Sequence, residues 1–318
     1  MSVTFRARLA LATAALAVVL PAAAVDSVKM MIPANPGGGW DTTGRELGKA
    51  MTASGAVKNI QYDNKGGAAG TIGLAQFVNS AKGDPNALMM GGMVMVGGII
   101  QNKSAVNLSQ VTPVARLTSE YEVIVVPANG PKTLKELLDK FKANPGSVSW
   151  GGGSAGGTDH ILAGLIAKEV GVAPSKVNYV PFKGGGEAVS AIIGGHVTAG
   201  ISGLSEFAQH IKSGKMRALA VSSPKAMEGI PSLKEQGVNV ELVNWRGVWG
   251  APGITPDQRK ALIAAVEAGI ANPKWKETLE KLDWLPYVVT GDAFGAFVDS
   301  EDKRVGAILD SLNLGAKK

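Results

Sequence analysis

The chain has 318 residues, a hydrophobic fraction of 45%, a formal net charge of +6 and no cysteine. This length and composition fit one large globular domain or two of medium size. The lack of cysteine excludes disulfides and a lipid anchor attached through cysteine, and the scattered basic residues, without a block of like charge, argue against a nucleic-acid partner.

The first 24 residues have the pattern of a secretion signal. Arg6 and Arg8 form a basic start, Leu9–Leu20 is an apolar run too short to span a bilayer, and Ala22–Ala24 supplies the small residues of a cleavage site. We therefore expect residues 1–24 to be removed on export and the mature protein to lie free in the periplasm. An uncleaved membrane anchor is the alternative.

The rest of the chain alternates between short apolar strands and helices. The sequence predicts strands at Val28–Ile32, Ile60–Asn64, Ala87–Met90, Val111–Leu117, Tyr121–Pro127, Val148–Trp150, Asn178–Pro181, Ala199–Ser202, Arg217–Ser222 and Asn244–Gly250. It predicts helices at Asp41–Met51, from the glycine-rich segment Asn64–Gly73 to about Phe77, and at Thr133–Asn144, Thr158–Val170, Gly186–Ile193 and Glu206–Lys212. Capping boxes begin at Thr133 and Thr255. This alternation is typical of βαβ units and parallel sheets covered on both faces.

The end of the chain has a different pattern. After Gly250 the sequence predicts only helices, at Thr255–Ala271, Pro273–Leu282 and Asp292–Leu314. Helices without strands of their own must pack on a sheet built earlier in the chain. We therefore expect the C-terminal helices to complete the domain with which the mature chain begins.

The fold class that follows is α/β, with two domains joined by two crossings near Tyr121–Asn129 and Val243–Gly250. Domain one would contain residues 25–127 and 243–318, and domain two residues 128–242. We see no low-complexity linker between them and no internal repeat.

Three glycine-rich segments each precede a predicted helix: Pro33–Arg45, Asn64–Gly73 and Trp150–His160. At such a helix start, free backbone N–H groups and the helix dipole attract an anion. None of the three carries a lysine where a nucleotide phosphate would need one. Three such loops behind a secretion signal indicate a protein that captures a small multi-anionic ligand outside the cytoplasm.

The third segment also fits a dinucleotide site. Gly151, Gly153 and Gly156 match the G-x-G-x-x-G fingerprint after a strand and before a helix. A nicotinamide cofactor would also need an acidic residue at the end of the next strand, which here ends Val180-Pro181-Phe182. The alternative interpretation is that this segment is only a tight turn and binds no ligand. We expect the protein to have no cofactor.

A serine hydrolase is the competing class of function. Gly152, Ser154 and Gly156 match the nucleophile elbow, but His196 and His210 do not follow it in an obvious active-site loop. The third histidine, His160, stands in the first turn of the helix after the loop, where a capping or packing role suits it as well. The three histidines are too far apart in sequence for a metal motif, so we expect no metal.

The first segment contains further candidates. Asp41 caps the helix or orients the loop, and Arg45 pairs with it across one helical turn. Trp40 either walls the pocket or packs at a domain edge. The methionines Met89, Met90, Met93 and Met95 are predicted to fill the core.

The ordered segments PANPGGGWDTTGR, NKGGAAGTIG, WGGGSAGGTDHILAG and YVPFKGGGEA, with the later WRGVWGAPGITP, resemble a known family. They are similar to the extracytoplasmic binding subunits of tripartite tricarboxylate transporters, the TctC or Bug family, over essentially the whole mature chain. The GGGWD form resembles the tricarboxylate branch.

This resemblance implies a type II periplasmic-binding-protein fold, a two-domain venus flytrap that closes on a small carboxylate. By position it implies these ligand-binding residues: Pro36, Gly37, Gly38, Gly39, Trp40, Asp41, Gly67, Ala68, Ala69, Gly70, Thr71, Ser154, Ala155, Gly156, Gly157, Thr158, His160, Lys183, Gly184 and Ser202. Ser202 and Glu206 stand where many relatives carry an aspartate, and the sequence here reads TAGISGLSEF.

We therefore expect a periplasmic solute-binding protein for a small di- or tricarboxylate, citrate-like first. It would act as a monomer, deliver its ligand to the membrane subunits of a tripartite tricarboxylate transporter, and perform no chemistry. An exported hydrolase that uses Ser154 and a sensory carboxylate-binding protein remain alternatives.

Overall fold

The computed structural model describes residues 25–183 and 185–314, so the predicted secretion signal and Gly184 lie outside the described residues. The strands are β1 (Val25–Ile32), β2 (Val57–Asn64), β3 (Ala87–Gly92), β4 (Thr112–Pro127), β5 (Ser149–Gly152), β6 (Asn178–Pro181), β7 (Ala199–Gly203), β8 (Met216–Val221), β9 (Val243–Gly250) and β10 (Leu285–Thr290). The α-helices are α1 (Gly39–Ala53), α2 (Thr71–Ser80), α3 (Met93–Gln101), α4 (Leu134–Ala143), α5 (Thr158–Glu169), α6 (Gly185–Ile193), α7 (Leu204–Lys212), α8 (Pro256–Ala271), α9 (Pro273–Lys281) and α10 (Gly291–Ser311).

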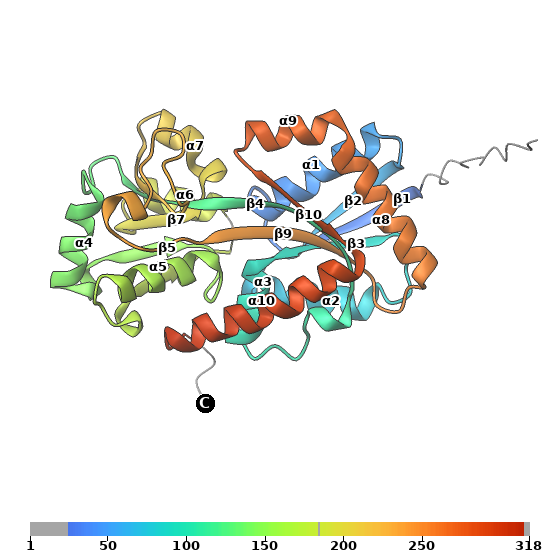
Figure 1. Cartoon of the computed structure of the whole chain (residues 1–318), viewed down its shortest axis with the longest axis horizontal. Helices are drawn as coiled ribbons and strands as arrows, with labels where there is room; N and C mark the ends of the chain where they lie inside the picture. Colours follow the sequence, from blue (N-terminus) through green and yellow to red (C-terminus); the bar gives the residue numbers. More distant parts are fainter. Residues whose placement is uncertain (1–24, 184, 315–318) are drawn as a thin grey trace, which may run out of the picture.

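The strands form two sheet regions that share β4. The strand order is β2-β1-β3-β9-β4-β7-β5-β6, with β10 and β8 also paired to β4. The first part of β4, Thr112–Tyr121, pairs with β9 and β10, and the last part, Glu122–Pro127, pairs with β7 and β8. Figure 1 shows β4 and β9 running between the two halves of the molecule.

We call these halves the first and second lobes. The first lobe holds β1, β2, β3, β9, β10 and the first part of β4, with α1, α2, α3, α8, α9 and α10. The second holds β5, β6, β7, β8 and the last part of β4, with α4, α5, α6 and α7 (Figure 1). The predicted two-lobe α/β architecture with two crossings is confirmed. The residue boundaries given above for the domains stay a prediction.

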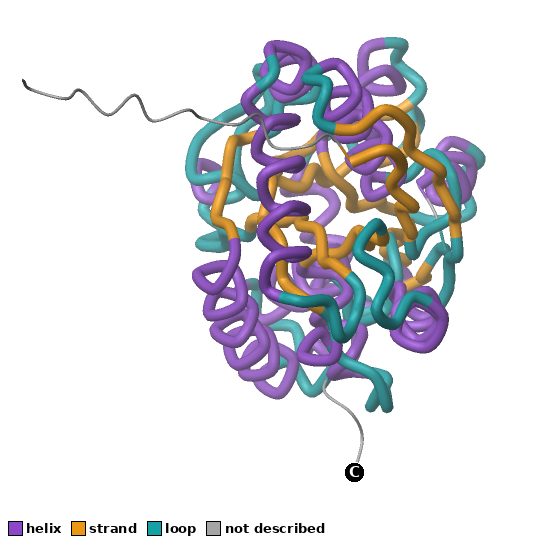
Figure 2. The backbone as a smooth tube through the Cα atoms, turned by 90° about the vertical axis from the view of Figure 1, so that its right-hand side faces the viewer, coloured by secondary structure: helices purple, strands orange, loops and turns teal. Residues whose placement is uncertain are grey.

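Helices lie on both sides of the strands (Figure 2), so the central strands are buried on both faces. All six residues of β3 are buried. Met89, Met90, Met93 and Met95 are completely inaccessible to solvent, which confirms the prediction that they fill the core. Buried parallel strands need apolar residues on both faces, and this explains the continuous apolar runs in the sequence.

The prediction that only helices follow β9 is wrong. β10 pairs antiparallel with β4 and lies at an edge of the first lobe's sheet. Leu285 and Val288 of this strand are exposed, so β10 lacks the buried alternation by which sequence reasoning finds a strand. Helix α3 lies where the sequence predicted no helix, and the two strands predicted at Val111–Leu117 and Tyr121–Pro127 form the single strand β4.

The helix caps agree with the sequence in part. Thr255 and Gln258 form the predicted reciprocal capping box at the start of α8. Thr133 accepts a hydrogen bond from the Glu136 N–H, but the Glu136 carboxylate accepts from the N–H of Lys132 instead of the cap residue. Each cap satisfies backbone groups that a helix end leaves unpaired.

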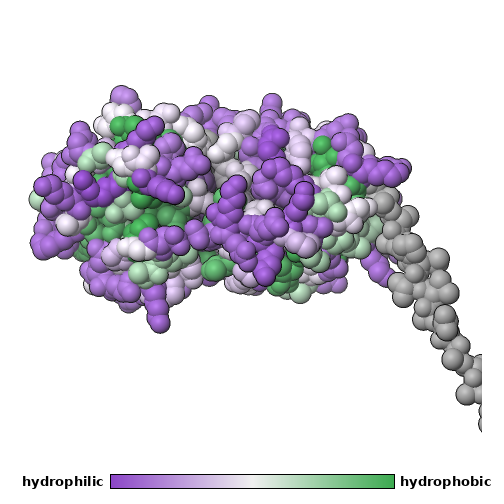
Figure 3. All heavy atoms as spheres, turned by 90° about the horizontal axis from the view of Figure 1, so that it is seen from above, coloured by the Kyte–Doolittle hydropathy of each residue, from purple (hydrophilic) through white to green (hydrophobic). Residues whose placement is uncertain are grey.

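Hydrophilic residues cover most of the face that Figure 3 shows. Within residues 25–183 and 185–314, the helices are all too short or too polar to cross a membrane.

Candidate functional site

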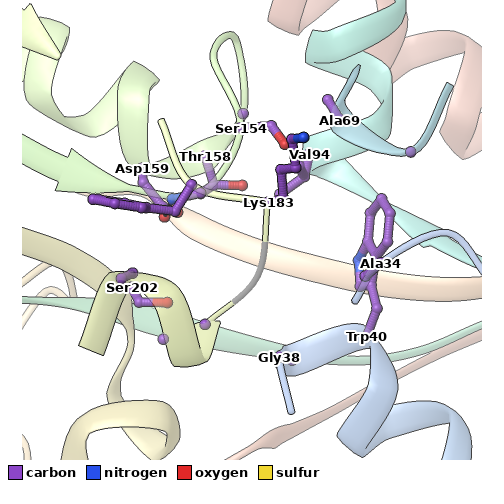
Figure 4. Close-up of a pocket in the computed structure, with 18 of the residues that line it drawn as sticks. Ala34, Gly38, Trp40, Ala69, Val94, Ser154, Thr158, Asp159, Lys183 and Ser202 are labelled. Atoms are coloured by element: carbon purple, nitrogen blue, oxygen red, sulfur yellow. Dashed lines mark hydrogen bonds between the residues drawn. The ribbon is translucent and has the colours of Figure 1, made fainter. Parts of the chain in front are cut away.

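A cavity of about 100 Å³ lies where the two lobes meet. From the first lobe it is lined by Pro33, Ala34, Gly38, Gly39, Trp40, Gly67, Ala69, Gly70 and Val94, and from β9 by Asn244 and Arg246. From the second lobe it is lined by Gly153, Ser154, Gly157, Thr158, Asp159, Phe182, Lys183, Gly185, Ala188, Ser202, Gly203 and Glu206. In Figure 4 the Thr158 and Ser202 hydroxyls point toward the side where Trp40 and Gly38 lie.

The N-terminal ends of α1, α2, α3, α5, α6 and α7 all reach this cavity. Their first residues or caps contribute to its wall, Gly39 for α1, Gly70 for α2, Val94 for α3 and Thr158 for α5 among them. The first N–H groups of a helix have no intrahelical partner, and each helix start carries a partial positive charge. The cavity therefore sits in a field that attracts an anion.

The first glycine loop is held by Asp41. Its carboxylate accepts hydrogen bonds from the Gly37 N–H at 3.0 Å, from Arg45 Nε at 2.9 Å and from Asn64 Nδ2 at 2.9 Å. Burial alone would raise the pKa of Asp41, but these hydrogen bonds lower it below its usual value. The predicted Asp41–Arg45 pair is thus confirmed, and Asp41 orients the loop without reaching the cavity wall.

Trp40 closes the first-lobe side of the cavity. Its side chain is 7% exposed, and its ring lies so close to Gly70 that a Cβ there would come within 2.7 Å of it. Gly67, Ala68, Ala69 and Gly70 all have positive φ angles, from 47° to 130°. Glycine adopts such angles without strain and alanine does not, so Ala68 and Ala69 of this second glycine-rich segment have a strained backbone conformation.

The third loop has fewer free donors than its glycine content suggests. The Gly153 N–H donates to Asp159 Oδ2 at 2.5 Å, the Gly156 N–H to His160 Nδ1 at 3.1 Å, and the Gly157 N–H to the Ser154 carbonyl at 3.0 Å. Ser154 and Thr158 of this segment line the cavity. The Thr158 hydroxyl donates its one hydrogen to Asn244 Oδ1 at 3.2 Å, so it must turn away from Asn244 to donate to a ligand.

His160 is built into the second lobe and does not line the cavity. Its ring stacks on Tyr179 at a centroid distance of 4.2 Å, and burial lowers its pKa to about 4. The Nδ1 atom accepts a backbone hydrogen bond, so it is not a base for Ser154. Among the described residues that line the cavity there is no histidine.

Arg246, which our site prediction omitted, joins β9 to the other crossing strand. Its guanidinium is 2% exposed and donates to Glu120 of β4 and to Thr43 Oγ1 of α1, the latter at 3.2 Å. Glu120 also accepts from Trp284 Nε1 at 2.8 Å. Gly39 and Gly203 leave the room for this pair, because a Cβ at either would collide with Arg246 or with Glu120.

Three further carboxyls surround this ion pair. Glu206 Oε1 lies 3.7 Å from Arg246 Nη2, and neither carboxyl oxygen of the buried Glu122 has a hydrogen-bond partner. Burial, together with the neighbouring carboxylates, raises the pKa of Glu122 well above its usual value, that of Glu206 to about 8 and that of Asp159 to about 6. In the described part of the chain, acidic residues and histidines form no group of three suited to a metal ion.

The structure brings part of the predicted site together. Of the residues predicted, those at the cavity wall are Gly38, Gly39, Trp40, Gly67, Ala69, Gly70, Ser154, Gly157, Thr158, Lys183 and Ser202. Those that do not line the cavity are Pro36, Gly37, Asp41, Ala68, Thr71, Ala155, Gly156 and His160. Thr71 turns its hydroxyl to the Ala68 carbonyl at 2.8 Å and so closes its own turn. Gly184 is outside the described residues.

Two α/β lobes, two crossing strands and a cavity at their junction make up a fold that this chain shares with solved periplasmic binding proteins. Residues 48–314 match the family model TctC, described as the tripartite tricarboxylate transporter family receptor. The chain belongs to this family, whose members bind solutes and are not enzymes.

Curated relatives match the chain at moderate identity. The "UPF0065 protein in gbd 5'region" of Cupriavidus necator is 28% identical over 324 residues, with 97% of this chain and 96% of the relative covered. BugT of Bordetella pertussis is 25% identical over 290 residues, with 89% and 88% covered.

Solved structures show the same fold. The periplasmic binding protein BugD matches with a TM-score of 0.83 at 23% identity, covering 92% of this chain and 99% of its own. MatC from Rhodopseudomonas palustris, solved with bound malate, matches with a TM-score of 0.79 at 22% identity, covering 90% and 99%. R. palustris Rpa4515, solved with adipate, matches with a TM-score of 0.83 at 20% identity, covering 92% and 99%.

Proposed function

We propose that this protein captures a small carboxylate between its lobes in the periplasm and delivers it to the membrane subunits of a tripartite tricarboxylate transporter. The observation that carries the proposal is the convergence of helix N-termini on the cavity between the lobes. Free N–H groups at helix starts are suited to carboxylate oxygens. The binding of malate by MatC and of adipate by Rpa4515 supports the same class of ligand.

In this proposal each lobe supplies part of the carboxylate contacts. The starts of α1 and α2, at Gly38–Trp40 and Gly67–Gly70, donate backbone N–H groups. Ser154 and Thr158 contribute hydroxyls from the second lobe, and Ser202 adds a third. Trp40 shields the ligand from water. Such contacts recognise the carboxylate, and the shape of the cavity selects among carboxylates.

The size of the cavity bears on the choice of ligand. Its volume of about 100 Å³ is below the roughly 150 Å³ of an engineered protein cavity that holds benzene. A ligand as large as citrate would hold the lobes further apart than they are here. We therefore propose a compact dicarboxylate first and keep citrate as the larger candidate.

A thermal-shift screen of the chain without residues 1–24 tests the proposal with malate, succinate, adipate and citrate, and glucose as the uncharged control. A ligand at about 100 times its Kd adds about 2.7 kcal/mol to the stability of the folded state and raises Tm. We expect at least one carboxylate to do so and glucose to have no effect. Stabilisation by glucose alone would contradict a carboxylate function.

Delivery to a transporter is tested separately from binding. A strain that lacks this protein should lose uptake of the radiolabelled carboxylate and regain it when the gene is restored. Uptake that persists in that strain, together with loss of a transcriptional response to the carboxylate, would favour the sensory alternative.

A further inference from the structure

The second-lobe wall of the cavity is acidic, although the proposed ligand is an anion. Glu206 and Asp159 both line it, and the cations on the wall are Lys183 and Arg246. Arg246 is already bonded to Glu120 behind the wall. Two ionised carboxylates in this wall would therefore repel a carboxylate ligand at close range.

The packing around Arg246 shows that these carboxyls cannot all be charged. Glu120, Glu122, Asp159 and Glu206 gather near a single guanidinium, and all but Glu206 are at least nine-tenths buried. Removing an ionised carboxylate from water without a partner costs far more than protonating it. Some of these groups must carry a proton in the folded protein, and the raised pKa values of Glu122, Asp159 and Glu206 agree with this.

Glu206 is placed to present such a proton to a ligand. Its side chain is 15% exposed and lies where the lobes meet. A Cβ at Gly39 of α1, in the first lobe, would come within 2.8 Å of its carboxyl group, and a Cβ at Gly185 of α6, in the second lobe, within 2.5 Å.

The charged and polar groups that face Glu206 come from several elements. They are Ser202 of β7, which hydrogen-bonds it, Arg246 of β9, Glu120 and Glu122 of β4, Asp159 of α5 and, on the same cavity wall, Lys183. The positive end of α1 also approaches it. Burial and the nearby carboxylates outweigh Arg246, which is shared with Glu120, and raise the pKa of Glu206.

We propose that Glu206 meets the ligand as a neutral carboxylic acid, donates its O–H to a ligand carboxylate, and so makes ligand capture take up one proton from solvent. The inference rests on the proposed carboxylate function and adds a specificity determinant to it. Protein donors then surround the ligand from both lobes: backbone N–H groups from the first and the Glu206 O–H from the second. An ionised Glu206 offers only acceptors and must bind a proton before the ligand can bind.

Titration calorimetry tests this with malate and adipate as probes, because their carboxyls are ionised throughout pH 7–9. If the bound state needs Glu206 protonated, affinity falls about tenfold between pH 7 and pH 9. Repeating each titration in two buffers with different ionisation enthalpies counts the protons. We expect net proton uptake at pH 8–9.

Glu206→Gln separates this role from a general effect of pH. Glutamine keeps a neutral donor at this position and does not titrate, so the affinity should become independent of pH to within about twofold and the proton uptake should vanish. Glu277→Gln is the matched control, because Glu277 is an exposed glutamate of α9 away from the cavity. It should keep the pH dependence of the wild type.

The outcomes distinguish this inference from the function on which it rests. Wild-type affinity that stays constant or rises from pH 7 to pH 9, without proton uptake, overturns the inference while leaving carboxylate binding in place. So does a folded Glu206→Gln variant that loses affinity at pH 7, since a neutral amide donor would then be unable to replace Glu206 and its role could not be that of a neutral O–H donor. If no carboxylate binds between pH 5 and pH 9, the proposed function fails and this inference fails with it. If Glu206→Gln does not fold, the proton count on the wild type decides.

Discussion

Arg246 shows how much one side chain holds in place. It connects β9 with β4 through Glu120 and with α1 through Thr43. Arg246→Met would leave Glu120 buried without a cation, and breaking one side of a buried ion pair lowers the free energy of unfolding by about 3–5 kcal/mol. Urea denaturation measures the loss.

Lys58→Met is the control for Arg246→Met. The Lys58–Asp26 pair is exposed to solvent, so its loss should leave the free energy of unfolding nearly unchanged. The double variant Arg246→Met, Glu120→Gln should recover part of the loss, because it removes the unpaired charge. Equal effects of Arg246→Met and Lys58→Met would contradict this account of the pair.

Ser154 separates a binding protein from a hydrolase. It lines the cavity, and no histidine among the described residues lines it with Ser154. Ser154→Ala removes one hydrogen bond to a charged group, worth about 1.5–3 kcal/mol, so carboxylate affinity should weaken by roughly ten- to a hundredfold. Calorimetry on both proteins measures this, alongside an assay with an activated ester. Serine-dependent ester turnover with unchanged affinity in Ser154→Ala would reverse the assignment.

Residue patterns predicted some site members and could not predict others. The glycine loops, Trp40 and the Asp41–Arg45 pair are local in sequence, so spacing and turn chemistry identify them. The cluster of Glu120, Glu206 and Arg246 is assembled by strand pairing between distant segments. A single charged residue inside an apolar strand carries no periodic signal, and only the register of β4 with β9 shows which charges meet.

At the scale of elements, the alternating pattern predicted most of the fold. It missed α3 because Gly97 and Gly98 lower helix propensity. Both must lack a Cβ, because Gly97 lies against the backbone of Gly156 and Gly98 against the Cβ of Ala69. It missed β10 because that strand is an exposed edge. It divided β4 at polar residues such as Ser119 and Glu120, which are buried here by tertiary contacts.

The start of α5 should give the protein a sensitivity to acid. Burial lowers the pKa of His160 to about 4, below the usual value of 6.5. The unfolded chain therefore binds a proton first, so the stabilisation from neutral His160 is complete above pH 6.5 and is lost as pH falls toward 4. His160→Asn keeps a side-chain acceptor for the Gly156 N–H and does not titrate. Urea denaturation at several pH values should show wild-type stability falling relative to this variant between pH 6.5 and 4. Parallel curves would contradict the role assigned to His160.

At the scale of the whole molecule, Gly97 limits how closely the lobes approach. It lies on α3 of the first lobe, where a Cβ would collide with the carbonyl oxygen of Gly156 in the second. Gly97→Ala should therefore hold the lobes apart and weaken carboxylate affinity at least about tenfold, a loss of about 1.4 kcal/mol. Small-angle scattering with saturating malate or adipate should give a larger radius of gyration than in the wild type.

Gly306→Ala is the control, since Gly306 is also helical and a Cβ there makes only ordinary contact with Ile100. It should leave affinity and radius unchanged, with stability equal or slightly higher. A Gly97→Ala protein with the affinity and radius of gyration of the wild type would contradict the claim that Gly97 limits the approach of the lobes.

The position of β9 also determines the order in which the fold can be completed. In the sheet β9 lies between β3 and β4, but in the chain it follows the whole second lobe. Until Val243–Gly250 has been synthesised, the first lobe consists of a β2-β1-β3 fragment and a separate β4 with no strand to join them. Folding therefore cannot proceed lobe by lobe from the N-terminus, and the last quarter of the chain must arrive before the first quarter is stable. This late completion extends the time in which the growing chain stays without a finished first lobe.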